Sequence, residues 1–364
     1  MRILYITNGI AGAGGLERVL ALKASYLADE MGYGIHILTL NQNEKKLFFD
    51  FSSKIEYHDI NVSGTPAQYF HRYRRGIGEV IDKVIPHIII VCDDGLKGFF
   101  IPLLFRKKCP IIYERHVSKL IELGEKPGFI EKKVVGLKFW LMNRLAGNFD
   151  KFVVLTNDNR LEWNLKNLIV IANPLSFYPL EVSNLRNKQV IAVGKQSFQK
   201  GFDRLLRSWA IVHAKNPDWR LSIYGKFDES QGLVSQAIQL GIKTTVDFFE
   251  PVSNIQEKYQ ESSIYTLSSR FEGFGMVLIE AMACGVPCVS FDCPYGPGDI
   301  ISDEIDGFLV ANNDISGMAE RINILIENKE LRLQMGTKAR ENVKGYSLQN
   351  IMPLWDALFR SLVR

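Results

Sequence analysis

The chain has 364 residues, too many for one ordinary hydrophobic core and about the number that two domains need. It is 46% hydrophobic and 23% charged, which excludes a disordered chain, and no run approaches the roughly 18 consecutive apolar residues of a membrane span. The net charge of +4 is uneven, because residues 1–174 carry 24 Lys and Arg against 18 Asp and Glu. This basic first half predicts an anionic surface or acceptor as partner, and we expect no nucleic-acid partner.

Strand and helix patterns alternate along the whole chain, which predicts parallel sheets with helices on both faces. In the first half, apolar runs predict strands at 2–7, 34–40, 55–59, 87–92, 110–113 and 151–155. That half also contains a clear amphipathic helix from Leu16 to Met31. Two prolines and polar residues over 174–187 indicate a domain linker.

The alternation restarts after this linker. Apolar runs predict strands at 189–193, 220–224, 245–248, 264–267 and 288–291. Helical patterns lie at 203–214, 233–240, 255–260, 315–327 and 348–362. The expected fold class is therefore α/β, with one Rossmann-like domain over residues 1–174 and a second over residues 175–346.

Five cysteines are present, and Cys92, Cys284 and Cys288 lie in apolar runs. We interpret these three as reduced core residues in a reducing cytosol. Cys284 and Cys288 do not make a convincing zinc pair, because no second Cys/His pair follows at ligand spacing. Met1 leads almost at once into the first strand, so we expect no signal peptide and a cytoplasmic location.

Gly12, Gly14 and Gly15 follow the first predicted strand and precede a helix. The spacing is not G-x-G-x-x-G, and Thr39-Leu40-Asn41 ends the second strand without an acidic residue, so a nicotinamide site fits poorly. One interpretation is a tight turn between strand and helix. The other is a loop without side chains that lets a substrate phosphate or sugar approach backbone N–H groups.

Two further polar groups follow predicted strands. Lys195 and Lys200 come directly after the strand 189–193, where cations at a strand's carboxyl end suit a diphosphate. His116 follows the strand 110–113 beside Glu114 and Arg115. Solvated lysines and a structural histidine are the alternative interpretations.

Glu272 and Glu280 are the most informative pair in the chain. Glu272 lies in a Gly-rich turn, and Glu280 lies in an apolar helical run from Met276 to Cys284. The backbone N–H groups near Gly275 and Met276 form an open helix N-terminus, which is a natural phosphate site. Two carboxylates around a phosphate make sense if each accepts hydrogen bonds from sugar hydroxyls. The alternative is an acidic surface loop followed by a helix-face Glu.

These motifs resemble those of GT4-type retaining glycosyltransferases of the GT-B fold. The resemblance rests on E-x7-E at Glu272 and Glu280, on Gly14-Gly15-Leu16-Glu17-Arg18, which is similar to the family's GG-x-E-R, and on the two lysines. The family usually has Arg where Lys195 stands, a departure that keeps the charge but loses bidentate geometry. The resemblance implies two Rossmann-like domains facing across a cleft, with a C-terminal helix (347–364) that returns to the N-domain.

The resemblance also implies roles for the matched residues, with the acceptor on the N-domain and the donor on the C-domain. Glu280 would hold the ribose hydroxyls, Glu272 the donor-sugar hydroxyls, and His116 the far side of the sugar. The implied catalytic residues are His116, Lys195, Lys200 and Glu272. The implied donor-binding residues are Gly14, Gly15, Lys195, Lys200, Phe248, Phe249, Gly273, Phe274, Gly275, Met276 and Glu280, with one of the two phenylalanines on the nucleobase and the other in the core. The implied acceptor or sugar-pocket residues are Arg18, Arg115, Thr156, Asn173 and Gly298.

No Asp-x-Asp occurs in the chain, and Asp93-Asp94 is adjacent rather than spaced. The usual carboxylate scaffold for a metal on a sugar nucleotide is therefore missing. We expect no metal and no cofactor, with the leaving diphosphate neutralised by Lys195, Lys200 and the helix N-terminus.

Segment 117–147 mixes basic residues with aromatic and aliphatic ones. One interpretation is an interfacial stretch that docks on an anionic membrane, helped by the nearby basic residues Arg72, Arg74, Arg75, Arg106, Lys107 and Lys108. The alternative is a core-facing helix with a solvated basic side. The first interpretation predicts peripheral association with the inner face of the plasma membrane.

The sequence thus predicts a retaining, metal-independent glycosyltransferase of bacterial surface-polysaccharide biosynthesis. It would move a hexose or N-acetylhexosamine from a nucleotide-diphosphate sugar, with UDP the expected nucleotide, to a glycan or polyprenyl-diphosphate-linked acceptor. The alternatives are a GT-B-fold epimerase or phosphorylase and a non-catalytic nucleotide-sugar-binding protein.

Overall fold

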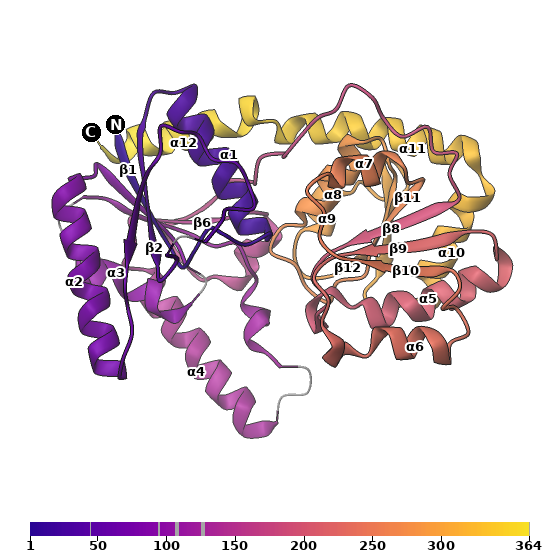
Figure 1. Cartoon of the computed structure of the whole chain (residues 1–364), viewed down its shortest axis with the longest axis horizontal. Coiled ribbons are helices and arrows are strands. Elements are labelled where there is room, and N and C mark those ends of the chain that lie inside the picture. Colours follow the sequence, from indigo (N-terminus) through magenta and orange to yellow (C-terminus); the bar gives the residue numbers. More distant parts are fainter. Residues whose placement is uncertain (44, 94, 106–108, 125–127, 364) are drawn as a thin grey trace. The chain divides into compact units, whose positions relative to one another are not determined.

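The computed structural model describes residues 1–43, 45–93, 95–105, 109–124 and 128–363 (Figure 1). Two compact units make up the chain. The first contains Met1–Pro174 and the last helix, α12 (Leu348–Leu362), and the second contains Leu175–Ser347. Each unit is an α/β domain built on its own parallel sheet.

The first unit has a seven-stranded sheet in the order β3-β2-β1-β4-β5-β6-β7, and all its neighbours pair in parallel. Its strands are β1 (Arg2–Thr7), β2 (Gly34–Leu40), β3 (Glu56–Ile60), β4 (Ile88–Cys92), β5 (Ile111–Glu114), β6 (Lys151–Val154) and β7 (Leu168–Val170). Its other helices are α1 (Gly15–Asp29), α2 (Pro66–Val84), α3 (Ile101–Leu104) and α4 (Phe129–Ala146), with 3-10 turns at Leu96–Phe100, Lys119–Glu122 and Asp158–Glu162.

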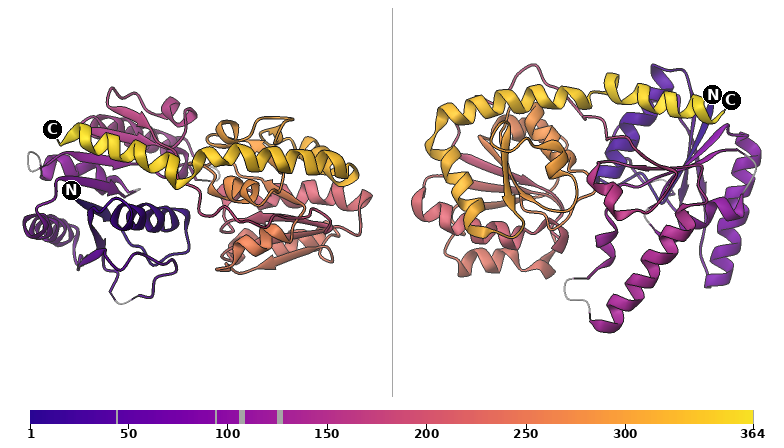
Figure 2. Two further views of the ribbon diagram at one scale, coloured as in Figure 1. Left: turned by 90° about the horizontal axis from the view of Figure 1, so that it is seen from above. Right: turned by 180° about the vertical axis from the view of Figure 1, so that it is seen from behind.

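Successive residues of the central strands enter opposite cores, because side chains alternate across a strand. Ile3 and Tyr5 of β1 pack under α1 and α12 on one face, and Leu4 and Ile6 pack on the α2 side. Figure 2 shows α12 lying beside α1 in the first unit. The last helix therefore completes the core of the unit in which the chain begins.

The second unit has a six-stranded parallel sheet in the order β10-β9-β8-β11-β12-β13. Its strands are β8 (Gln189–Val193), β9 (Arg220–Tyr224), β10 (Val246–Phe249), β11 (Ile264–Leu267), β12 (Cys288–Asp292) and β13 (Gly307–Ala311). Its helices are α5 (Phe202–Lys215), α6 (Leu233–Gln239), α7 (Ile255–Gln260), α8 (Met276–Ala283), α9 (Pro297–Ile300), α10 (Ile315–Glu327) and α11 (Lys329–Asn342), with 3-10 turns at Phe198–Lys200, Glu229–Gln231 and Val343–Tyr346.

Strand order reverses once in each sheet. In the first unit β1 and β4 are neighbours, with β2 and β3 added on the β1 side and β5, β6 and β7 on the β4 side. In the second unit β8 and β11 are neighbours, with β9 and β10 on the β8 side and β12 and β13 on the β11 side. Ligands of open α/β sheets bind at the carboxyl ends of the strands where the order reverses. The loops after β1 and β4, and those after β8 and β11, are therefore the places to look for a site.

The expected fold class is confirmed, with two Rossmann-like α/β domains. Most expected strands agree with the structure to within one or two residues. The residue patterns did not indicate β7, β13, α2, α3, α9 and α11. Of the described helices, none combines the length and apolarity that a bilayer crossing requires.

Candidate active site

An ion pair joins the two loops at the reversal point of the second sheet. Lys200 ends the turn after β8, Glu272 lies in the loop between β11 and α8, and Lys200 Nζ is 2.7 Å from Glu272 Oε1. The two side chains are only 18% and 6% exposed. The hydroxyl of Ser269 donates to the same carboxylate oxygen. The sequence placed both residues in this region, and the structure shows them in direct contact.

Arg270 fastens the same two loops together. Its guanidinium forms two hydrogen bonds with the Asp203 carboxylate, at 2.9 and 2.8 Å, and a third with the carbonyl of Phe198, at 2.7 Å. Its backbone N–H donates to the carbonyl of Gln199, and the Gln199 side chain donates to that of Phe271. A bidentate Arg–carboxylate pair is both strong and directional. These bonds therefore fix the backbone that carries Lys200 and Glu272.

Glycine is required at two positions where a loop closely approaches the β11–α8 segment. Gly201 follows Lys200 in the left-handed conformation, with φ 62°, and a Cβ there would lie 2.2 Å from the carbonyl oxygen of Ser268. Gly296 has φ 112°, and a Cβ would lie 2.0 Å from the carbonyl oxygen of Phe274. Any side chain at either position would force the loop away from its neighbour.

Glu280 is the second carboxylate of the E-x7-E motif, and it is completely buried on α8. Its two oxygens accept hydrogen bonds from Ser176 Oγ, at 2.8 Å, and Tyr259 OH, at 3.3 Å. Hydroxyl groups thus already surround this carboxylate. A ribose hydroxyl that bound Glu280 would make the same kind of hydrogen bond as these two hydroxyls make.

The N-terminus of α8 lies between the two carboxylates in sequence. Gly275 precedes the helix with φ 103° and offers no side-chain cap to the first backbone N–H groups. Gly273 and Phe274 are buried, the Phe274 ring packs edge-on against Tyr346, and Met276 is half-buried. An uncapped helix start with its partial positive charge suits an anion.

The other predicted residues of this unit are Lys195, Phe248 and Phe249, for donor binding, and Gly298, for the acceptor or sugar pocket. Lys195 is exposed at the end of β8, and Gly298 is exposed in α9. Phe248 packs against the hydrophobic core, whereas Phe249 is 40% exposed and stacks on Tyr224 with ring centroids 4.7 Å apart. The structure thus assigns Phe248 to the core and leaves Phe249 as the accessible aromatic ring.

In the first unit, the Gly-rich loop follows β1 at the reversal point of that sheet. Gly14 and Gly15 are exposed, and the Glu17 side chain folds back so closely that a Cβ on Gly14 would lie 2.5 Å from its Oε2. The Arg18 guanidinium stacks 5.0 Å from the centre of the Phe49 ring. Arg18 therefore lies at the base of the loop rather than projecting freely.

His116 belongs to a buried charged group that the sequence did not fully predict. Its Nε2 is 3.3 Å from Oε1 of Glu114, which also forms an ion pair with Lys23 of α1. Burial raises the pKa of Glu114, but Lys23 and His116 outweigh this effect and hold the pKa at about 2. Lys23 Nζ also lies 3.6 Å from the centre of the Trp355 ring of α12. Glu114 is therefore an ionised carboxylate that orients the His116 imidazole.

The other predicted residues of the first unit are buried near strand ends. Arg115 Nε donates to the carbonyl of Val117 at 2.8 Å, and Thr156 Oγ1 accepts from the Asn159 backbone at 3.1 Å. Asn173 is 3% exposed, and its Oδ1 has no hydrogen-bond partner among the described residues. His116 and these residues belong to the first unit, and the two carboxylates of the motif belong to the second.

Comparison with known proteins decides the family. A family model described as glycosyl transferases group 1 matches residues 181–342. An uncharacterized glycosyltransferase of Haemophilus influenzae is 31% identical over 370 residues, which cover 98% of this chain and 99% of that protein. The chain belongs to the group 1 glycosyltransferases.

Two further similarities cover nearly the whole chain. The amylovoran biosynthesis glycosyltransferase AmsD of Erwinia amylovora is 28% identical over 366 residues, or 98% of each chain. The crystal structure of HepE from Anabaena in complex with UDP-glucose has a TM-score of 0.79 at 17% identity, covering 100% of both chains. The fold is GT-B, and the protein is a glycosyltransferase, as the E-x7-E resemblance implied.

Sequence reasoning missed the residues that hold the predicted ones in place. Four residues contact a predicted site residue or its loop and were not predicted themselves: Lys23, Arg270, Asp203 and Ser176. Lys23 carried one signal, a lone cation within the apolar stripe of α1. Arg270 and Asp203 are far apart in sequence, and nothing in either local pattern indicates their pairing.

We predict that Gly201→Ala destabilises the second unit more than Gly232→Ala does. Both glycines precede a helix with nearly the same backbone, φ 62° and ψ 31° against φ 61° and ψ 20°. The left-handed conformation should cost either alanine roughly 1–2 kcal/mol. Only Gly201 adds the 2.2 Å approach to the Ser268 carbonyl, whereas no described atom lies within 4 Å of a Cβ on Gly232. Urea unfolding measures both changes, and equal losses would mean that the loop at Gly201 can move aside.

We predict that Lys23→Met lowers the free energy of unfolding of the first unit by about 3–5 kcal/mol at pH 7, the usual cost of breaking a buried ion pair. The pKa of Glu114 is lowered from 4.5 to about 2, so the stability that its ionised form supplies is present above pH 4.5 and is lost as the pH falls toward 2. The difference between parent and variant should shrink over that range. Urea unfolding at several pH values measures it.

The double variant Lys23→Met/Glu114→Gln is the control for this prediction. Removing the carboxylate together with its cation leaves no uncompensated buried charge, so part of the lost stability should return at pH 7. If the double variant were no more stable than Lys23→Met, lost packing at Lys23 would explain the effect instead of the charge.

Proposed function

We propose that this glycosyltransferase transfers a hexose or N-acetylhexosamine from a UDP-sugar to a glycan or lipid-linked glycan acceptor, with retention of the anomeric configuration and without a metal ion. The observation that carries the proposal is the contact between Lys200 and Glu272 at the reversal point of the second sheet. At this point Lys200 supplies a cation for a diphosphate, and the adjacent Glu272 supplies a carboxylate for sugar hydroxyls. We assign the donor to the second unit and the acceptor to the first.

The ion pair suggests how the donor site is prepared. Without substrate, Lys200 neutralises the nearly buried Glu272 and avoids the cost of an unpaired charge. A diphosphate offers Lys200 a second anion, and Glu272 can then accept hydrogen bonds from the donor sugar. Ser269 stays on the carboxylate and keeps it oriented. Glu280 is the proposed ribose contact, and its two hydroxyl donors resemble the ribose hydroxyls it would bind.

UDP is the nucleotide that the comparisons favour. HepE of Anabaena, which shares the fold, has been crystallised with UDP-glucose. In this chain Phe249 is the accessible ring at the carboxyl end of β10 that could stack on a nucleobase. The acceptor class is suggested by AmsD, whose name assigns it to amylovoran biosynthesis. We propose bacterial polysaccharide biosynthesis as the setting of this enzyme.

The transfer step breaks the bond between the sugar C1 and the diphosphate oxygen, and a bond forms between C1 and the acceptor hydroxyl oxygen. The bonding electrons of C1 leave with the diphosphate, whose oxygen on the same face takes the proton of the acceptor hydroxyl. Negative charge grows on the leaving group, so the residues near it matter most in the transition state. Lys200, Lys195 and the open N-terminus of α8 are the groups we assign to that charge.

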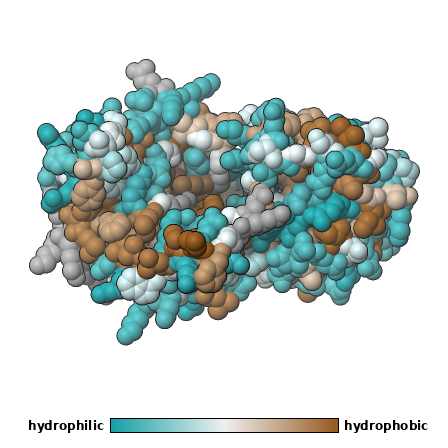
Figure 3. Space-filling model, turned by 90° about the horizontal axis from the view of Figure 1, so that it is seen from below, coloured by the Kyte–Doolittle hydropathy of each residue, from teal (hydrophilic) through white to brown (hydrophobic). Residues whose placement is uncertain are grey.

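A membrane surface is the second partner we propose for the first unit. Five apolar side chains of α4 are 60–77% exposed, namely Phe129, Ile130, Val134, Leu137 and Trp140. Lys132, Lys133 and Arg144 are exposed on the same helix, and Lys133 lies over the Phe129 ring. Figure 3 shows apolar side chains gathered on this face. Exposed apolar groups beside cations suit an anionic lipid surface.

Only four α4 residues are buried, and they lie in its middle and at its end: Val135, Met142, Leu145 and Ala146. Three of these four lie in the last five residues, so the alternative of a core-facing helix applies to the C-terminal end of α4. The basic residues Arg106, Lys107 and Lys108, which the sequence analysis added to this surface, lie outside the described residues, as do Lys126 and Asp94.

We predict that the parent enzyme transfers sugar from a UDP-sugar equally well in excess EDTA and in magnesium, and that Lys200→Met lowers kcat more than it raises KM. A charge-assisted hydrogen bond contributes about 1.5–3 kcal/mol, so kcat should fall about 10- to 150-fold. A panel of nucleotide sugars, assayed first for slow hydrolysis and then with lipid-diphosphate acceptors, identifies the donor.

Lys188→Met is the matched control, because Lys188 pairs with Asp218 on the surface of the same unit. It should leave kcat and KM unchanged. Loss of all transfer in EDTA, restored by magnesium or manganese, would contradict the metal-independent mechanism. Absence of both hydrolysis and transfer across the whole panel would contradict the donor assignment.

We predict that the protein binds anionic vesicles more strongly than neutral ones, and that salt weakens the binding. Each basic residue near such a surface contributes about 1 kcal/mol, so several must act together. Vesicle flotation measures the bound fraction. The variant Phe129→Ser/Trp140→Ser should bind less, whereas Leu161→Ser, which alters an 81% exposed leucine outside α4, should bind like the parent. Equal and negligible binding to both kinds of vesicle would rule the surface out.

A further inference from the structure

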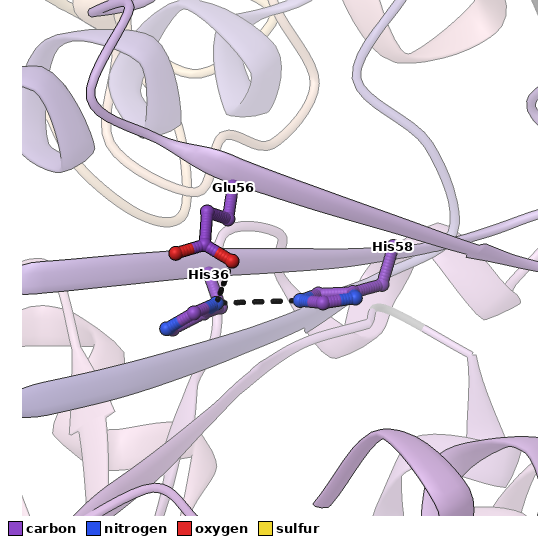
Figure 4. A group of neighbouring side chains, drawn as sticks. All are labelled: His36, Glu56 and His58. Carbon is purple, nitrogen blue, oxygen red and sulfur yellow. Dashed lines mark hydrogen bonds and ion pairs between the residues drawn. The ribbon is translucent and has the colours of Figure 1, made fainter. Parts of the chain in front are cut away.

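Two histidines and a glutamate meet on the outer strands of the first sheet, at some distance in sequence from every predicted site residue. His36 lies on β2, and Glu56 and His58 lie on the neighbouring edge strand β3. In the parallel register His36 pairs with Glu56, and Leu38 pairs with His58. All three side chains therefore point to the same face of the sheet, and Figure 4 shows them converging.

The distances from His36 Nδ1 to the other two ligand atoms are close to those around a tetrahedral metal ion. His36 Nδ1 is 3.3 Å from His58 Nε2 and 3.5 Å from Glu56 Oε2, and all three ligand atoms lie within 4.8 Å of one another. Two ligands placed about 2.0–2.1 Å from zinc at a tetrahedral angle are about 3.3–3.4 Å apart. The side chains would need little movement to bind an ion.

Hydrogen bonds alone do not satisfy this group well. A neutral imidazole carries one N–H, so its other ring nitrogen keeps a lone pair. One proton at most can lie between the two facing nitrogens, and the carboxylate faces the same nitrogen of His36. A cation at the centre would use all three lone pairs at once. Arg2 and Lys83 are the nearby positive charges that oppose a cation, and Glu56 offsets part of their effect.

We propose that His36, Glu56 and His58 bind one zinc ion or a similar borderline divalent metal, with water at the fourth position. Two imidazoles and one carboxylate are a common zinc ligand set. The Glu56 side chain is 69% exposed, so an ion and its water can enter from solvent.

The position of this site indicates a structural role. His36 and Glu56 lie in the amino-terminal halves of their strands, whereas the loops at the reversal point follow the carboxyl ends. β3 is the edge strand and pairs only with β2. A metal held by both strands would fasten the edge strand to the sheet. The site thus goes beyond the proposed sugar transfer and takes no part in it.

The test uses the full chain without a polyhistidine tag, stripped of metal and then titrated with Zn²⁺ or Co²⁺. Calorimetry should show one ion bound per chain, and Co²⁺ should give the visible bands of a tetrahedral complex. His58→Gln and Glu56→Gln should each weaken binding at least about tenfold, since even loss of a residue that only supports a ligand costs about 10- to 100-fold. His71→Gln, which alters an exposed histidine of α2, should bind like the parent.

A second readout separates binding from an effect on activity. Zinc should raise the thermal unfolding temperature of the parent and leave that of His58→Gln unchanged, because a ligand of the native state stabilises it by mass action. His58→Gln should keep the parent's transfer rate, so failure of the metal site and failure of the proposed transfer are distinguishable. If the parent binds no ion, or if His58→Gln binds it as tightly as the parent, the three residues form only a hydrogen-bonded cluster.

Discussion

The proposed donor site depends on the joining of two loops of the second unit that the sheet topology brings together. Because the strand order reverses between β8 and β11, the loops after these strands leave the sheet side by side. The Arg270–Asp203 pair and the backbone bond from Arg270 to Gln199 then lock one loop to the other. Lys200 and Glu272 are held in contact by backbone that these bonds fix, so their distance is set before any substrate arrives.

Each unit contains a buried carboxylate, and the two carboxylates have different kinds of partners. Glu114 pairs with Lys23, so its charge is balanced at the cost of burying a lysine, and His116 contacts the same carboxylate oxygen. Glu280 instead accepts hydrogen bonds from the hydroxyls of Ser176 and Tyr259, which orient it. The first arrangement resists change, because removing Lys23 leaves the buried Glu114 charge without its cation. The second can exchange one hydroxyl for another, which suits a carboxylate whose proposed ligand is a sugar.

The fold was predictable from the sequence because parallel strands buried on both faces give continuous apolar runs, such as Ile88–Cys92. The elements that were missed have weaker signals. β7 has three residues, all only half-buried, and β13 begins with a glycine within a turn-rich segment. α2 is an amphipathic helix rich in Arg and Tyr, whose polar residues obscured its buried stripe of Tyr73, Ile77 and Ile81. Contacts such as Arg270 with Asp203 depend on tertiary structure and leave no local pattern.

The same reasoning explains why the sequence marks candidate donor-binding residues more clearly than candidate acceptor-binding ones. A diphosphate needs cations or backbone N–H groups and a sugar needs carboxylates, so Lys200, Gly275 and Glu272 stand in recognisable positions after strands and before a helix. Acceptors differ from one enzyme to the next, and no fixed chemistry marks their contacts. Thr156 caps a turn and Arg18 stacks on Phe49, so each has a structural use that its sequence context could not separate from binding.

Asn173 differs from both, because its buried Oδ1 has no partner among the described residues. A buried oxygen that receives no hydrogen bond carries a free-energy cost, and a hydroxyl group of a bound substrate could remove that cost. Among the residues predicted to contact the glycosyl acceptor, Asn173 therefore has a clear physical reason to bind a ligand.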